Sequence, residues 1–60
     1  MAKMILIREW DSDKFHDSVM KLEAEGFVTK LETYQIEPES DPDTGKIIHL
    51  YTIEMHKQDN

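Results

Sequence analysis

Apolar and β-branched residues gather in three stretches of this chain, at residues 3–10, 27–36 and 46–56. Runs rich in Val, Ile, Thr, Tyr and Phe are typical of β-strands, because these side chains fit a pleated, half-buried surface. The sequence therefore predicts three strands at these positions.

The segment between the first two stretches has the period of a helix. Phe15, Val19 and Leu22 recur at intervals of four and three residues, which places them on one helical face. Acidic residues just before this segment offer N-cap candidates and favourable charge for a helix start. Gly26 can adopt the positive φ that often follows a last helical turn. We expect a helix at about residues 12–25.

Two prolines mark the connection between the last two strands. Pro38 and Pro42 lack the amide hydrogen that a β-ladder requires, so residues 37–45 are predicted to form a loop. Short connections then make the last two strands a hairpin and place the third strand between the other two. The predicted fold is α+β, a three-stranded antiparallel sheet (β-α-β-β, order 1-3-2) with one helix on one face, in a single domain over residues 1–60.

The predicted strands carry apolar residues on both faces, whereas one helix covers only one face of a sheet. A half-exposed antiparallel strand normally alternates apolar and polar residues. The pattern therefore favours a homodimer, formed through the open sheet face or an edge, that buries Leu50, Tyr51, Ile53 or their neighbours. Scattered surface apolar residues are the alternative. A chain of 60 residues without Cys also gains from oligomerisation, because its own core is small.

Negative charge is concentrated in two segments of the chain. Thirteen acidic residues face seven basic ones, a net charge of −6. Residues 37–45 hold four acids and no base, and residues 11–25 hold five acids and two lysines. Such charge disfavours direct binding to nucleic acid or to an anionic membrane and selects a basic protein partner. The partner-binding residues that we predict from these clusters are Glu37, Glu39, Asp41, Asp43, Asp13 and Asp17.

The acidic residues of the predicted loop allow three interpretations. Glu39, Asp41 and Asp43 alternate as ligands do in an EF-hand calcium loop, but Gly45 comes one residue late and strands flank the segment. A solvated hairpin loop is the second interpretation. In the third, alternate carboxylates of an extended chain repeat at roughly 6.6 Å. That spacing is similar to the spacing of successive phosphates, so it predicts a DNA mimic.

No residue pattern predicts catalysis, a metal site or a cofactor. The chain has no Cys, and His49 and His56 are seven residues apart, which points them to opposite faces of a strand. No nucleophile stands in a triad-like order with a base. We therefore expect a non-enzymatic protein. The apolar run at residues 4–7 is too short to span a membrane, so we expect a cytoplasmic location, in the host cell if the protein is phage-encoded.

The chain resembles three families of similar size only in part. Tautomerases share its length and β-α-β start but need Pro directly after the first Met, where this chain has Ala2. Dodecins, which bind flavin, share the element order, but their Trp in the second strand has no match here, where Tyr34 is the only large polar aromatic. A small acidic sporulation-protein family of bacilli is similar in length and element order, which implies a structural or assembly role.

In length, acidity and lack of an active-site motif, the chain is most similar to the small acidic proteins with which phages disable host factors. Its pI is near 4.8. That group includes DNA mimics, among them an inhibitor of the nucleoid protein HU. The resemblance implies a host-takeover protein whose carboxylates stand where phosphates would stand, opposite Lys and Arg of an HU-like partner. It rests on no diagnostic motif, so it transfers no individual residue.

Overall fold

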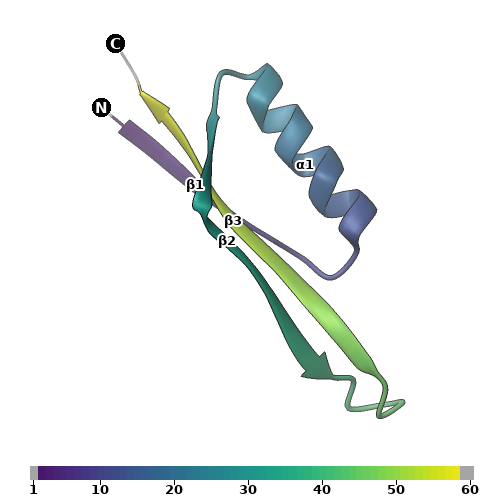
Figure 1. Ribbon diagram of the computed structural model, residues 1–60. Helices are drawn as coiled ribbons and strands as arrows, with labels where there is room; N and C mark the ends of the chain where they lie inside the picture. Colours follow the sequence, from purple (N-terminus) through teal and green to yellow (C-terminus); the bar gives the residue numbers. More distant parts are fainter. Residues whose placement is uncertain (1, 59–60) are drawn as a thin grey trace.

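A three-stranded antiparallel sheet with one helix on one of its faces forms the fold (Figure 1). The computed structural model describes residues 2–58 of the chain. Its elements are β1 (Ala2–Glu9), α1 (Ser12–Ala24), β2 (Val28–Ser40) and β3 (Ile47–Gln58). The strand order is β1-β3-β2, and β3 pairs with both neighbours. The predicted α+β fold, its element order and its sheet order are therefore confirmed.

Asp11 closes the N-terminus of α1. Its carboxylate accepts hydrogen bonds from the N–H groups of Asp13 (2.8 Å) and Lys14 (3.3 Å). Replacing Asp11 with alanine removes this acceptor and should lower the free energy of unfolding by about 1 kcal/mol. Asp11→Asn keeps an acceptor and should lose much less. Urea denaturation followed by circular dichroism measures both variants, and equal losses would show that capping contributes nothing.

α1 ends in a Schellman motif at Gly26. Gly26 has φ 98° and donates a hydrogen bond to the carbonyl of Glu23 (3.0 Å), while Phe27 donates to the carbonyl of Leu22 (3.0 Å). These two bonds satisfy carbonyls of the last helical turn, and glycine tolerates the positive φ that the turn requires. The turn reverses the chain, so that Phe27 enters the core just before β2 begins.

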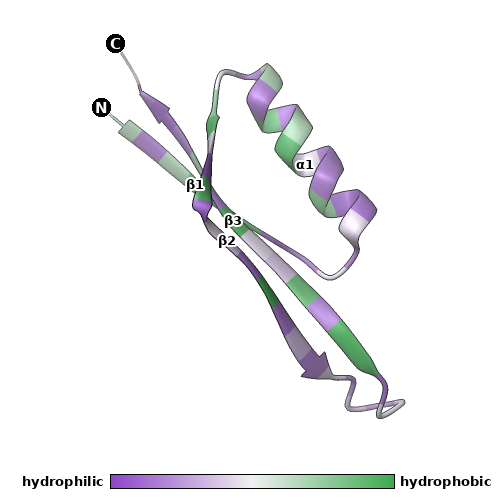
Figure 2. Cartoon of the chain, viewed as in Figure 1, coloured by the Kyte–Doolittle hydropathy of each residue, from purple (hydrophilic) through white to green (hydrophobic). Residues whose placement is uncertain are grey.

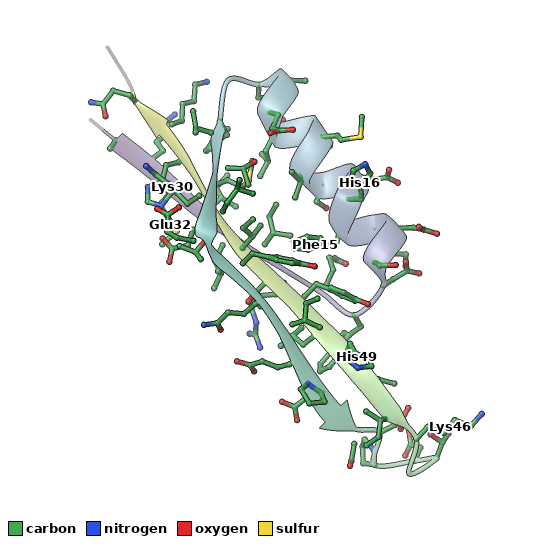
Figure 3. All side chains as sticks on the ribbon, viewed as in Figure 1. Phe15, His16, Lys30, Glu32, Lys46 and His49 are labelled. Atoms are coloured by element: carbon green, nitrogen blue, oxygen red, sulfur yellow. The ribbon has the colours of Figure 1, made fainter. Side chains whose placement is uncertain are left out.

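The core lies between α1 and the sheet. Its buried residues are Ile7, Phe27, Ile53 and Met55, and α1 packs Phe15, Val19 and Leu22 against them. Odd-numbered residues of β1 and β3 therefore face the helix, and even-numbered residues point to the opposite face, here called the open face. Figure 3 shows Phe15 pointing toward the sheet, where its ring centroid lies 5.7 Å from that of Tyr34 and 5.8 Å from that of Tyr51.

β2 extends to Ser40, so the prediction that residues 37–45 form a loop is wrong for its first part. Each residue from 37 to 40 pairs with a residue of β3. The connection between the two strands is confined to residues 41–46. The acidic segment therefore begins on a strand, and its first residues have the fixed alternation of a strand.

Pro38 is tolerated within β2 because this strand lies at an edge of the sheet. The N–H of Glu54 in β3 points to β2, where it donates to Thr33. Successive amides of a strand point to opposite sides, so even-numbered amides of β3 face β2. The amide of His49, which stands opposite Pro38, therefore points away from β2 and toward the other side of β3. The pair exchanges no hydrogen bonds, and the missing N–H of Pro38 faces outward.

A bulge interrupts β2 at residues 31–34. Lys30 and Gln35 are the paired residues on either side, and they stand opposite β3 positions that are only two apart. The hydroxyl of Thr33 bridges the interruption. It accepts a hydrogen bond from the N–H of Glu54 (2.9 Å) and donates one to the carbonyl of Lys30 (2.6 Å). One side chain thus holds the bulge to the central strand.

Beyond the end of β1, β2 and β3 continue as a two-stranded arm, residues 37–50. Glu9 at the end of β1 pairs with Tyr51, so β1 does not reach the arm. The arm projects past α1 and gives the molecule extents of 47 × 17 × 16 Å (Figure 1). Most of its residues are exposed, as expected of a ribbon that no third strand or helix covers. The arm is therefore accessible to a partner over most of its length.

Candidate partner-binding surface

Glu37 and Glu39 lie along β2 on the open face of the arm. They stand opposite Leu50 and Ile48, even-numbered residues of β3 that point away from α1. Both glutamates are exposed, and Figure 2 shows the hydrophilic end of β2 beside the apolar start of β3. Alternate positions of a strand are about 6.6 Å apart. The strand therefore holds these two carboxylates as a pair with extended spacing.

Asp41 belongs to the turn at the tip of the arm. Its carboxylate accepts hydrogen bonds from the N–H groups of Asp43 (2.8 Å) and Thr44 (3.4 Å). Its backbone closes the loop, donating to the carbonyl of Lys46 (2.8 Å) and accepting from the N–H of Gly45 (2.8 Å). The four acids that we predicted as one row are thus divided. The two glutamates form a pair, Asp43 is exposed at the tip, and Asp41 is a half-buried acceptor of the turn.

The two acidic residues predicted on the helix lie on a different side of the molecule. Asp13 and Asp17 are exposed on α1, and α1 covers the face of the sheet opposite the open face (Figure 3). Glu37 and Glu39 point away from that side. A flat partner surface therefore contacts one acidic group or the other, and the structure does not bring the two groups together.

The residues predicted for a dimer interface pack within the single chain. Ile53 is 3% exposed beneath α1, and Tyr51 is half-buried against the ring of Phe15. Leu50 is 7% exposed on the open face. Contact of Ile53 with a second copy would require α1 to leave the sheet, whereas Leu50 borders a hollow on the open face beside Leu6. The homodimer and its interface residues therefore stay predictions.

The open face of the sheet mixes exposed apolar residues, which the two-sided apolar pattern of the strands predicted, with charges, which that pattern did not predict. Met4 and Leu6 are exposed on it, and Leu6 stands opposite Glu54. A carboxylate oxygen of Glu54 lies 2.9 Å from Nε2 of His56, and Figure 3 shows Lys30 on the same side of the sheet. Because acidic and basic groups are interspersed here, the open face has less excess negative charge than the arm.

The chemistry that these surfaces offer is charge pairing. Residues 2–58 contain no group of three or more His, Asp or Glu side chains placed to hold a metal ion. Over the same range, no helix combines the length and the apolar character needed to cross a membrane.

Comparison with protein-family models, with curated proteins and with solved structures finds no match.

Proposed function

We propose that this chain is a non-enzymatic binding protein that uses its acidic arm to engage a basic, nucleic-acid-binding protein. The observation that carries the proposal is the arm, which projects from the body and bears four carboxylates against one lysine, Lys46. An exposed cluster of one sign attracts and orients partners of the opposite sign. The protein acts in the cytoplasm, where such a partner binds DNA.

The proposed mechanism is competition with DNA. Glu37 and Glu39 repeat at about 6.6 Å, and their carboxylates take the place of successive phosphates opposite Lys and Arg of an HU-like partner. Asp43 extends the acidic surface to the tip, whereas Asp41 holds the turn and adds only its charge. Inhibition of a nucleoid protein during phage infection is the setting that fits this mechanism.

Asp13 and Asp17 have a secondary role in the proposal. They point to the helix side of the molecule, so they add to the attraction at a distance and do not touch a partner bound on the open face of the arm. Lys14 and Lys21 on the same helix reduce their field. Charges separated by more than about 8 Å are largely screened at physiological ionic strength, so this contribution is the smaller one.

Replacing Glu37 and Glu39 together with Gln should weaken binding to the partner about tenfold, since each exposed charge pair contributes up to about 1 kcal/mol. Association should slow more than dissociation quickens, because clustered charge acts on steering. The fold should persist, as both side chains are exposed. The measurement is displacement of a fluorescently labelled DNA duplex from purified HU, followed by fluorescence anisotropy.

Asp13→Asn combined with Asp17→Asn is the matched control, because it removes the same charge from α1. It should weaken competition less than the arm variant does. Raising the salt concentration should erase most of the difference between the parent and the arm variant. If the arm variant displaces DNA as well as the parent, the arm is not the binding surface. A parent that displaces no DNA from HU at low salt contradicts competition for this class of partner.

A further inference from the structure

The two outer edges of the sheet differ in how they present their backbone. The edge of β2 is interrupted by the bulge at residues 31–34 and by Pro38, and both features discourage another strand from pairing. β1 has neither: its eight residues pair with β3 in one continuous register and include no Pro or Gly. Among the described strands, none lies on the outer side of β1. Its edge is therefore a regular template for another strand.

The outward-facing backbone groups of β1 follow from one hydrogen bond. The N–H of Glu54 points to β2, where it donates to Thr33. Because successive amides of a strand alternate in direction, odd-numbered residues of β3 turn their N–H and C=O groups to β1. Their partners in β1 are odd-numbered too. The residues of β1 whose N–H and C=O groups face outward are thus even-numbered, and they include Met4, Leu6 and Arg8.

We propose that a second copy of this chain binds at this edge, its β1 antiparallel to the first, so that two three-stranded sheets become one continuous sheet. Leu6 then stands opposite Leu6 of the second copy on the two-fold axis, and Met4 stands opposite Arg8 of the second copy. These are the residues with outward N–H and C=O groups, so each pair exchanges hydrogen bonds as an antiparallel ladder requires. Both helices lie on the same face of the joined sheet.

Charge selects this register. It places Lys3 opposite Glu9 of the second copy, once at each end of the interface, and Ile5 opposite Ile7. Opposite charges on directly facing residues stabilise antiparallel pairing. A shift of one copy by two residues sets Lys3 opposite Ile7, and the reverse shift sets Ile5 opposite Glu9. Neither alternative pairs residues of opposite charge, whereas the proposed register does so twice, so charge favours the proposed register even though it also sets Arg8 opposite Met4.

The interface also covers apolar surface that a single chain leaves in water. Ile5 is 40% exposed, Leu6 52% and Met4 56%. A small core without disulfides gains stability from such an assembly. The interface uses neither Leu50 nor Ile53, and it stands independently of the proposed function, because β1 does not extend into the arm.

Charge reversal tests the register. Lys3→Glu sets two glutamates against each other across the interface, and Glu9→Lys sets two lysines, so each should weaken the dimer about tenfold. The variant with both changes restores opposite charges and should dimerise as the parent does. Lys14→Glu makes the same charge change on α1 and should leave the dissociation constant near that of the parent. Sedimentation velocity from micromolar to millimolar protein measures all of them.

Amide hydrogen exchange provides a second readout. The N–H groups of Met4, Leu6 and Arg8 should exchange slowly in concentrated protein and faster on dilution. Met4→Pro removes an outward N–H without removing a bond to β3, so it should weaken the dimer while the circular dichroism spectrum stays native. The proposal is overturned by a parent that is monomeric at millimolar concentration, by a dimer that neither single charge reversal weakens, or by fast exchange of all three amides in the dimer.

Discussion

Replacing Ile53 with alanine is expected to leave little native protein at room temperature. Ile53 is 3% exposed, lies on the central strand and faces α1. Truncating its side chain leaves a cavity that the neighbours fill only in part, which costs about 2–5 kcal/mol. The core of a chain this small supplies rarely more than about 3–5 kcal/mol of stability. A single substitution can therefore remove most of the margin between the folded and unfolded states.

Ile47→Ala is the matched control for this variant, since Ile47 is 61% exposed in the arm. It should change the free energy of unfolding by no more than about 0.5 kcal/mol. Thermal denaturation followed by circular dichroism compares the two, at one protein concentration because association adds to apparent stability. Similar losses from both variants would contradict the placement of Ile53 in the core and of Ile47 on the surface.

Thr33→Val should destabilise the fold by about 1–3 kcal/mol, although the two side chains have nearly the same shape. The change removes the hydroxyl that accepts from the N–H of Glu54 and donates to the carbonyl of Lys30. It leaves the partly buried Glu54 amide without that acceptor. Because this hydroxyl joins the bulge to β3, its loss should also loosen the pairing of β2 next to the bulge, from which the arm extends.

Thr33→Ser keeps the hydroxyl and is the control for this effect. It should be more stable than Thr33→Val, even though serine is the smaller residue. Urea denaturation gives the free energies, and amide exchange at Glu54 reports the lost hydrogen bond directly. A valine variant with parent stability and a protected Glu54 amide would show that the bulge does not depend on this side chain.

The element order and the sheet order were predictable because both rest on local patterns. The spacing of Phe15, Val19 and Leu22 marks one helical face, and these residues pack on the core. Short connections between the elements leave few ways to arrange three strands, and the antiparallel order β1-β3-β2 follows from them.

The prediction of a loop at Pro38 was wrong because the effect of a proline depends on which side of its strand is paired with a neighbour. A proline forbids a hydrogen bond only where its amide would face a neighbouring strand. The sequence shows the proline, but it does not show that β2 lies at the edge or that His49 stands opposite in a pair without hydrogen bonds. Those facts come from the register, which the bulge at residues 31–34 shifts.

The acidity of the candidate surface was predictable, but its geometry was not. The extended row of carboxylates is broken because Asp41 turns to the amides of Asp43 and Thr44. This motif has a local signal, since Asp commonly binds backbone N–H groups two residues on. The burial of Leu50 and Ile53 has no such signal, because it depends on side chains that other strands and the helix supply.

The position of β3 at the centre of the sheet sets the order in which the chain can fold. β1 and β2 do not pair with each other, and every strand pair of the described sheet includes β3. Ala2 pairs with Gln58, so the ladder joins residues from opposite ends of the described range. During synthesis, β1, α1 and β2 leave the ribosome before β3, so the central strand with which β1 and β2 pair is not yet present. Because every strand pair includes β3, no part of the sheet can form before β3 has been made, and the pairing of β1 with β3, which joins distant residues, is the slower step.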